Sequence, residues 1–192
     1  MNTEQMLEKL KTELSEKRYV HSLGVRDEAV RMAKLFDADE EKAYIAGLLH
    51  DCAKYPSYIE EEKKLIKYKP EIDSLTLICR PVLHAPLGAA VAEAEYGIND
   101  CEILNAIRFH TTAKEDMSLL EKIIYVADMT EPSRDFEGVD ILRELSGSDI
   151  DKAFTEALRQ SLIFNLKKKT IIHTDTLKAW NWMCINNRRG NI

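Results

Sequence analysis

The sequence predicts an all-α protein folded as one domain, and three observations lead to this class. Apolar residues recur at the i, i+3, i+4 spacing of an amphipathic helix along most of the chain. Alternating apolar and polar runs of the β type are scarce, and "SLTLIC" at 74–79 is the one short stretch that could form a strand. The length of 192 residues is enough for one well-buried domain.

Each predicted helix is marked by its own apolar stripe. In chain order, the stripes run over residues 6–14, 25–36, 45–49, 104–107, 119–127 and 153–162. Pro86 suits the first turn of a further helix, where a missing N–H costs nothing, and Gly97 suits the end of that helix. We therefore expect eight or more helices in one bundle, without repeats or a low-complexity linker.

Composition and charge exclude several classes of protein. Apolar residues make up 45% of the chain and charged residues 31%, which is typical of a folded globular protein rather than a disordered one. The net charge of −6 argues against a general nucleic-acid binder, which would show a basic face. It does not exclude a small anionic ligand, because a metal or a few basic residues can reverse the sign locally.

The chain carries no sign of a membrane segment or of disulfides. No stretch approaches the ~18 apolar residues that span a bilayer, and the amino-terminal residues lack the apolar core of a signal peptide. The four cysteines, Cys52, Cys79, Cys101 and Cys184, form no C-x-x-C pair, and we interpret them as small core residues in a reducing cytosol. We expect a cytoplasmic protein with neither a membrane nor a nucleic acid as partner.

Metal-capable side chains stand where predicted helices begin or end. They are His21, His50, His84 and His110, together with Asp51 directly after His50 and Asp128 at the close of "KIIYVAD". Taken singly, each has an ordinary explanation: His21 could cap a helix, and His50 with Asp51 could be an ion pair. If the helix ends converge, the same residues form a pocket of four imidazoles and two carboxylates. That mixture suits iron, manganese, cobalt, nickel or zinc, and two divalent ions there would attract phosphate oxygens.

The residues around these side chains resemble a known family. The relevant stretches are "KRYVHSLGV", "AGLLHDCAK", "LHAPLGAAVA", "AIRFHTTAKEDMSLLEKIIYVADMTEPSRDFEGVDILR" and "IIHTDTLKAWNW". They resemble the HD-domain superfamily of metal-dependent phosphohydrolases and, within it, the YqeK family of symmetrical diadenosine-tetraphosphate hydrolases. The resemblance implies a single HD-domain helical bundle over 1–192. Its metal-site core would span about 17–135, with C-terminal helices over 139–185 packed on that core.

The resemblance also implies a reaction and a ligand set. A metal-activated water would cleave diadenosine tetraphosphate into two ADP. The first metal would be held by His21, His50, Asp51 and Asp128; His84 and His110 would complete a second site, with Asp51 bridging. Iron is the expected metal, one or two ions per chain, with manganese, cobalt, nickel and zinc as alternatives.

Four further residues are candidates for contact with the substrate. Lys54 and Arg134 would contact phosphate, with Lys54 acting beside Asp51 in catalysis, and Thr111 and Lys114 in "HTTAK" would also bind substrate. The family usually reads H-T-[ST]-G-R at this point. Ala113 does not take a positive φ as freely as glycine, and Lys114 lacks the fork with which arginine grips phosphate. We expect any effect to fall on loop shape and substrate affinity, not on the metal ligands.

Two alternative functions stay open at the level of sequence. The same chemistry could act on another nucleotide, such as a dNTP, a nucleoside diphosphate or an alarmone. A non-catalytic sensor could instead bind a nucleotide through a decayed site and signal to a partner. His173 in "IIHTDT" is expected to be an N-cap or surface residue and not a ligand. The family also implies a homodimer.

Overall fold

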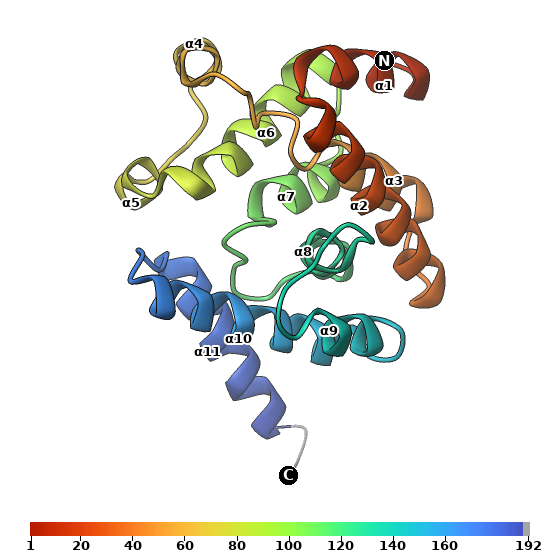
Figure 1. Ribbon diagram of the computed structural model, residues 1–192, viewed down its shortest axis with the longest axis vertical. Coiled ribbons are helices and arrows are strands. Elements are labelled where there is room, and N and C mark those ends of the chain that lie inside the picture. Colours follow the sequence, from red (N-terminus) through yellow and green to blue (C-terminus); the bar gives the residue numbers. More distant parts are fainter. Residues whose placement is uncertain (190–192) are drawn as a thin grey trace.

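The computed structural model describes residues 1–189, and these residues form eleven helices with no strand (Figure 1). The all-α prediction is therefore confirmed. In chain order the helices are α1 (Thr3–Glu13), α2 (Glu16–Leu35), α3 (Glu40–Leu49), α4 (Tyr58–Tyr68), α5 (Ser74–Ile78), α6 (Arg80–Tyr96), α7 (Cys101–Phe109), α8 (Leu119–Thr130), α9 (Val139–Ser146), α10 (Ile150–Lys168) and α11 (Thr174–Arg189). In this described part of the chain, no helix has the length and apolar character that crossing a bilayer requires.

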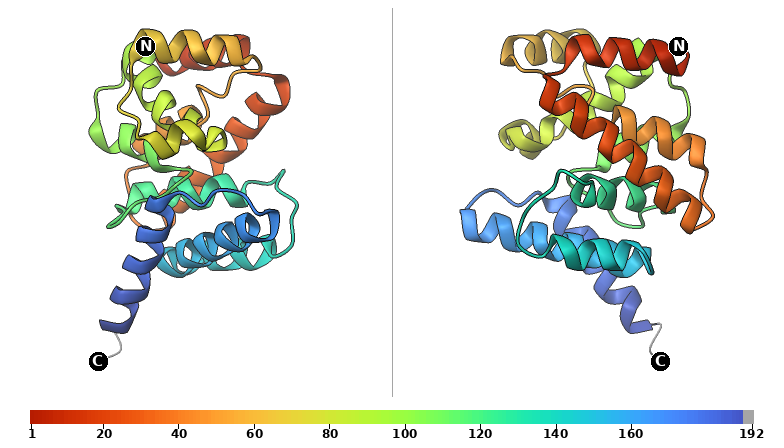
Figure 2. Two further views of the ribbon diagram at one scale, coloured as in Figure 1. Left: turned by 90° about the vertical axis from the view of Figure 1, so that its left-hand side faces the viewer. Right: turned by 45° about the vertical axis from the view of Figure 1, so that its right-hand side comes forward.

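Helix α8 lies at the centre of the bundle. It packs against α2, α3 and α7 on one side and against α9 and α10 on the other (Figure 1). Its side chains are apolar around most of the helix, and Ile123, Ile124 and Val126 are fully buried. Helices α9 and α10 run side by side against α8, and α11 leads away from them towards the carboxyl end (Figure 2).

Short polar side chains begin four of the five helices that carry or end beside the predicted ligands, α6 being the exception. Ser15, Asp39 and Asp100 accept hydrogen bonds from first-turn backbone N–H groups of α2, α3 and α7. Ser118 forms a capping box with Glu121 at the start of α8. At the other end of α6, Gly97 adopts φ +73 and ends the helix, as predicted.

The one stretch with a β-like pattern, 74–79, does not form a strand. Residues Ser74–Ile78 form the short helix α5, because the Asp73 side chain accepts a hydrogen bond of 2.8 Å from the backbone N–H of Thr76 and one of 3.1 Å from the Thr76 hydroxyl. Capping of the first turn thus outweighs the β propensity of so short a segment.

The predicted start of α6 was also wrong. The helix begins at Arg80 with Pro81 in its first turn, and Pro86 lies inside it. Pro81 occupies the position at which the missing N–H costs nothing, whereas Pro86 costs one internal hydrogen bond. His84 therefore projects from the body of α6 and does not precede the helix.

The cysteine prediction holds for two of the four residues. Cys52 and Cys79 are buried, Cys184 is half-buried, and Cys101 is exposed as the first residue of α7. All four are free thiols, as expected of a protein from a reducing compartment.

Candidate metal centre and phosphate site

The fold brings all six predicted metal ligands into one buried cluster. His21 comes from α2, His84 from α6 and Asp128 from α8, while His50, Asp51 and His110 stand at or just after the ends of α3 and α7. The four imidazoles and Asp51 are each no more than 6% exposed. Residues up to 107 positions apart in the chain, His21 and Asp128, approach to 3.0 Å between Nε2 and Oδ1.

Asp51 lies between two pairs of imidazoles and turns one oxygen towards each pair. Its Oδ2 is 3.4 Å from His50 Nε2 and 3.7 Å from His21 Nε2. Its Oδ1 is 3.0 Å from His84 Nε2 and 3.5 Å from His110 Nε2. A carboxylate placed in this way can bridge two cations, one held by each pair.

The tautomers of His50 and His110 direct nitrogen lone pairs at the centre of the cluster. His50 Nδ1 is 2.8 Å from the Gly47 carbonyl, and His110 Nδ1 is 2.7 Å from the Ile107 carbonyl. Because a carbonyl oxygen only accepts, each Nδ1 must carry the proton and each Nε2 must present a lone pair when the ring is neutral.

These lone pairs face the Nε2 atoms of the other two imidazoles. His50 Nε2 is 3.3 Å from His21 Nε2, and His84 Nε2 is 3.2 Å from His110 Nε2. Asp51 Oδ1 is buried and has no hydrogen-bond donor. Imidazole nitrogens and carboxylate oxygens that face one another in a buried cluster favour a bound cation, and this ligand set fits divalent transition metals.

The protonation states of Asp51, Asp128 and His84 suit metal binding. Burial opposes the charge on Asp51, but the imidazoles of His50 and His84 outweigh it and hold the pKa of the carboxyl well below its usual range. Burial likewise opposes the charge on Asp128, and His21 and His50 bring its pKa well below the usual range. Burial lowers the pKa of His84 to about 4, so that its ring is neutral at pH 7 and able to bind a metal.

Glu131 supports the cluster from behind His21, and the sequence analysis did not predict this residue. It is 2% exposed, and its Oε1 lies 3.0 Å from His21 Nδ1, the nitrogen that faces away from the cluster. A carboxylate in this position fixes the tautomer and the ring orientation of a ligating histidine. The signal available in the sequence was its spacing, since Glu131 follows Asp128 by three residues.

Three cationic side chains surround the carboxylates. Arg18 Nη1 is 2.5 Å from Asp51 Oδ2, and Lys54 Nζ is 3.8 Å from Asp51 Oδ1. Arg134 ion-pairs with Asp128 and donates from Nε to the Asp128 carbonyl at 2.6 Å. Arg18 was also missed, although its position one turn before His21 on α2 places it on the same helix face.

The "HTTAK" loop places its two substrate candidates differently. Thr111 lines a cavity beside the cluster, and its Oγ1 is buried without a hydrogen-bond partner. Lys114 Nζ lies 3.0 Å from Glu121 Oε2, the carboxylate that caps α8, and also donates to the Asp116 carbonyl. The structure therefore brings Lys54, Arg134 and Thr111 to the cluster or the cavity beside it, and pairs Lys114 with the start of α8. Ala113 adopts φ +58, so the loop has a left-handed turn despite lacking glycine.

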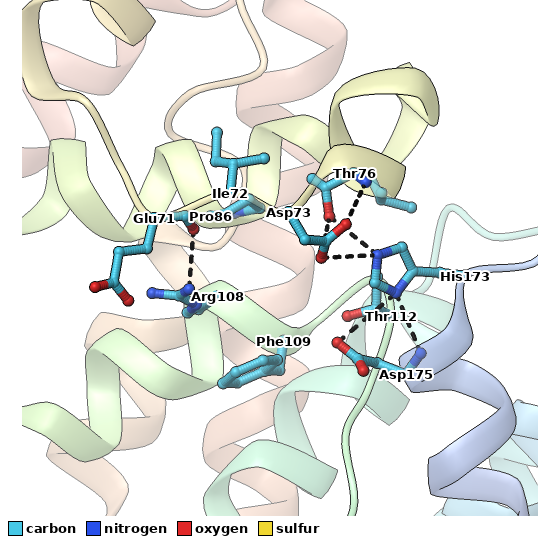
Figure 3. A pocket seen from close by; sticks show the side chains of 11 residues that line it. Glu71, Ile72, Asp73, Thr76, Pro86, Arg108, Phe109, Thr112, His173 and Asp175 are labelled. Atoms are coloured by element: carbon cyan, nitrogen blue, oxygen red, sulfur yellow. Dashed lines mark hydrogen bonds and ion pairs between the residues drawn. The ribbon is translucent and has the colours of Figure 1, made fainter.

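His173 lies outside the cluster, between α5 and α11 (Figure 3). Its Nδ1 accepts from the backbone N–H of Asp175 at 3.2 Å, which is the N-cap role that the sequence predicts. Its Nε2 is 3.0 Å from the Thr76 hydroxyl. Both ring nitrogens thus have partners, and the side chain is buried, not placed at the surface.

Comparison with known proteins places this geometry in a family. A family model described as "HD domain" matches residues 18–133, which include every member of the cluster. The "Bis(5'-nucleosyl)-tetraphosphatase, symmetrical" of Bacillus subtilis (strain 168) is 41% identical over 95% of this chain and 98% of the relative. The protein of the same name from Staphylococcus aureus is 36% identical over 98% of each chain.

A solved structure shares the whole fold. It is described as a predicted HD superfamily hydrolase involved in NAD metabolism from Clostridium acetobutylicum, and it matches with a TM-score of 0.91 and 40% identity over 97% of this chain and 98% of that one. The helical fold and the His–Asp cluster are those of the HD-domain class. Within this class, the chain belongs to the family of symmetrical bis(5'-nucleosyl)-tetraphosphatases, which confirms the resemblance seen in the sequence.

Proposed function

We propose that this chain is a metal-dependent phosphohydrolase that cleaves diadenosine tetraphosphate into two ADP. The observation that carries the proposal is Asp51, whose two carboxylate oxygens face two separate pairs of imidazole nitrogens. The name and full-length similarity of the relatives supply the substrate and the symmetry of cleavage. The alternatives, another nucleotide or a non-catalytic sensor, have no specific observation in their favour.

The proposed metal ligands divide into two sets around Asp51. His21, His50 and Asp128 would hold one ion with Asp51 Oδ2, and His84 and His110 would hold the other with Oδ1. Bound divalent ions would polarise the phosphoryl oxygens and lower the pKa of a bound water. Glu131 would keep His21 in the ligating tautomer throughout.

The three cations would serve the polyphosphate. Arg18, Lys54 and Arg134 are close to carboxylates whose charge a bound metal would neutralise. Each can then turn towards phosphate oxygens, with the two arginines offering paired donors and Lys54 a point charge. We include Lys54 in the catalytic group with Asp51, Thr111 among the substrate contacts and Lys114 at the margin of the site.

The reaction needs one water and produces two identical halves. The water oxygen attacks one of the two central phosphorus atoms, and the bond from that phosphorus to the central bridging oxygen breaks. The bridging oxygen leaves on the second ADP, and the two protons of the attacking water pass to solvent or to the new terminal phosphates of the two ADP. The leaving group is itself a phosphate ester, so a dedicated general acid is less necessary.

A turnover assay with defined metals tests the proposal. Protein stripped by a chelator is reloaded with Fe(II), Mn(II) or Co(II) and given diadenosine tetraphosphate, a dNTP, ADP or an alarmone in parallel. We expect two ADP from the first substrate. Release of product only from another nucleotide would redirect the proposal, and binding without turnover under every metal would make the chain a sensor.

The matched variants are D51N and D27N. Asp51→Asn keeps the size of the bridging side chain but removes its charge. We expect it to lower kcat more than about 100-fold, because mutation of even an outer-shell partner of a metal lowers metal affinity or activity 10–100-fold. Asp27 is 68% exposed on the same helix as His21, and its substitution should leave both activity and metal content unchanged. Full metal content and turnover in D51N would disprove the assignment.

Three further properties belong to the proposal. Iron is the proposed metal, which elemental analysis of protein purified without a chelator would check. A cytoplasmic location is supported by the four unpaired cysteines. A homodimer stays a prediction from the family, and light scattering of the purified chain would test it.

A further inference from the structure

Helix α8 ends in a turn, residues 131–134, that carries two groups of the proposed site. Glu131 opens the turn, and its Oε1 lies 3.0 Å from His21 Nδ1. Arg134 closes the turn, and its side chain ion-pairs with the proposed ligand Asp128. Both groups can serve the cluster only while the turn keeps one position relative to α8.

A guanidinium from another helix holds this turn in place. Arg143 of α9 donates from Nε to the Thr130 carbonyl at 3.1 Å, and from Nη2 to the Arg134 carbonyl at 2.8 Å. The same Nη2 also donates to the Glu131 carbonyl at 3.2 Å. Because the guanidinium is planar and its donors stand at fixed angles, one side chain joins the last residue of α8 to both ends of the turn.

These hydrogen bonds also satisfy the carboxyl end of α8. A helix leaves its last carbonyl groups without internal partners, and its dipole favours a cation there. Arg134 Nε donates to the Asp128 carbonyl at 2.6 Å. Arg143 donates to the carbonyls of Thr130 and Glu131. Since Arg143 supplies those donors, the guanidinium of Arg134 is left for the carbonyl and the carboxylate of Asp128.

Arg143 reaches the site through main-chain atoms and not through the side chains of the proposed ligands. Within residues 1–189, its side chain makes hydrogen bonds to those three carbonyls and to Asp140, whose Oδ1 lies 3.5 Å from Nη1. The Asp140 side chain is 94% exposed, so this fourth contact is a surface ion pair of little strength. Arg143 also lies beyond the HD-domain match, which ends at residue 133. It therefore belongs to what the C-terminal part of the chain adds to the generic core.

Helix α9 is tied in turn to α2, the helix that carries His21. Ser146 is fully buried at the end of α9, and its hydroxyl donates to the Arg143 carbonyl at 2.9 Å. The same hydroxyl accepts from Arg31 Nη2 of α2 at 3.1 Å. Arg143 is thus fixed relative to α2 as well as to α8, which suits a residue that sets the position of a neighbouring turn.

We infer that Arg143 is a positioning residue, which holds the 131–134 turn so that Arg134 presents its guanidinium to phosphate at the metal cluster. The inference rests on the proposed function, in which a bound metal neutralises Asp128 and Arg134 turns towards the polyphosphate. Arg143 itself touches neither substrate nor metal. Its removal should therefore weaken the affinity for phosphate while the six proposed ligands stay in place.

Direct binding of inorganic phosphate tests the inference through a double-mutant cycle. Phosphate is titrated calorimetrically into the full chain, kept saturated with Mn(II), as wild type, R143Q, R134Q and R143Q/R134Q. Phosphate can contact arginine without a base, a sugar or turnover. Calorimetry also separates two effects, because misfolded protein lowers the stoichiometry of binding, whereas a displaced Arg134 raises the Kd of the folded fraction.

We expect R134Q to raise the Kd for phosphate at least about tenfold, as for loss of a charge-assisted hydrogen bond, and R143Q to raise it nearly as much. The double variant should bind within about twofold of R134Q alone, because Arg143 acts through Arg134. An unchanged Kd in R143Q, with or without a reduced stoichiometry, would overturn the inference. Losses that multiply in the double variant would overturn it as well.

A second variant keeps the test decisive if R143Q folds poorly. R143K retains the positive charge at the end of α8, but a single ammonium replaces two donor nitrogens at fixed angles. We expect it to fold and to raise the Kd for phosphate about two- to tenfold, as for loss of one hydrogen bond. Wild-type affinity in R143K would contradict the role assigned to the guanidinium.

The matched control is D140N. It removes the exposed partner of Arg143 and leaves the three carbonyl contacts in place, so neither Kd nor stoichiometry should change. A loss of phosphate affinity in D140N equal to that in R143Q would assign the effect to the surface ion pair and overturn the inference.

The two hypotheses fail separately. If the wild type forms no ADP from diadenosine tetraphosphate while the cycle behaves as expected, the proposed function fails and Arg143 positions Arg134 at an anion site of another enzyme or sensor. If the wild type forms two ADP but R143Q binds phosphate normally, the function stands and the role of Arg143 falls.

Discussion

Gly24 contributes to the metal cluster because it has no side chain. A Cβ at this position would lie 2.8 Å from Glu131 Oε2, so the missing methyl group leaves space for the carboxylate that orients His21. The backbone of α2 is ordinary helix here, and close approach, not backbone conformation, explains the glycine.

Gly24→Ala should therefore weaken metal binding about tenfold by displacing Glu131, the scale of loss typical of an outer-shell partner. Mn(II) titration of the chelator-treated protein measures the effect. The double variant G24A/E131A should bind no more weakly than E131A alone, because both changes act through one contact. Additive losses would show that Gly24 acts by another route.

Ala113 holds a conformation that a side chain opposes. It is fully buried, and its φ of +58 lies in the left-handed region, where a Cβ costs about 1–2 kcal/mol. The loop nevertheless forms, because Thr176 donates from its hydroxyl to the Thr112 carbonyl at 2.7 Å and links α11 to this turn.

Ala113→Gly should stabilise the protein by up to about 1 kcal/mol, since relief of strain exceeds the loss of one small buried methyl group. Ala106 is equally buried but lies inside α7, so A106G should destabilise by about 1 kcal/mol. Urea unfolding of both variants supplies the measurement. The same sign for both would contradict the assignment of strain to Ala113.

At the scale of helices, Glu95 of α6 joins that helix to α1 and α4, two helices that the cluster does not reach. Lys9 of α1 donates to its Oε2 at 2.8 Å, and Lys64 and Tyr68 of α4 both contact its Oε1. Burial opposes the charge on this α6 carboxylate, but Lys64 and Lys9 outweigh it and lower its pKa to about 2, from a usual value of 4.5. Its ionisation therefore favours the folded state.

Because the folded pKa lies below the unfolded one, this contribution is complete above pH 4.5 and disappears as the pH falls towards 2. Glu95→Gln should cost about 1–3 kcal/mol in the free energy of unfolding at pH 7. The gap between variant and wild type should narrow below pH 4.5. Glu93 is exposed on the same helix, so the control E93Q should leave the free energy of unfolding at pH 7 unchanged. A gap for E95Q that is independent of pH would exclude the ionic explanation.

At the scale of the whole molecule, the residues of the cluster come from five helices, which meet at this site. Helices α2, α3, α6, α7 and α8 each bring or end beside a proposed ligand. Without a cation, the facing lone pairs and carboxylates repel one another inside the core. Metal binding and global stability should therefore be coupled.

Saturating Mn(II), at about 100 times Kd, should stabilise the chain by ~2.7 kcal/mol. For a protein of this size that corresponds to a rise in Tm of roughly 5–10 °C, which a chelator should reverse. Scanning calorimetry with and without EDTA is the measurement, and D51N should show less than half of the shift. A Tm that does not respond to metal would remove the cluster as a cation site.

Much of the site could be predicted because its signals are local. Periodic apolar residues mark the helices, and His50, His110 and Asp128 stand where those helices end, so the identity of the six clustered residues follows from the chain alone. The type of a short segment was harder to predict where β propensity and helix capping compete. At 74–78 the residues have a β-like pattern, but the capping hydrogen bonds of Asp73 stabilise the helix α5.

The sequence by itself determined that this protein is all-helical, which residues could bind a metal and to which family it belongs. Only the tertiary structure decided that Asp51 faces two imidazole pairs, that Glu131 stands behind His21, and that α10 walls a cavity beside Asp128. Helix formation depends on residues three or four positions apart, whereas these contacts join residues up to 110 positions apart. Such contacts depend on how the helices pack, which no local pattern encodes.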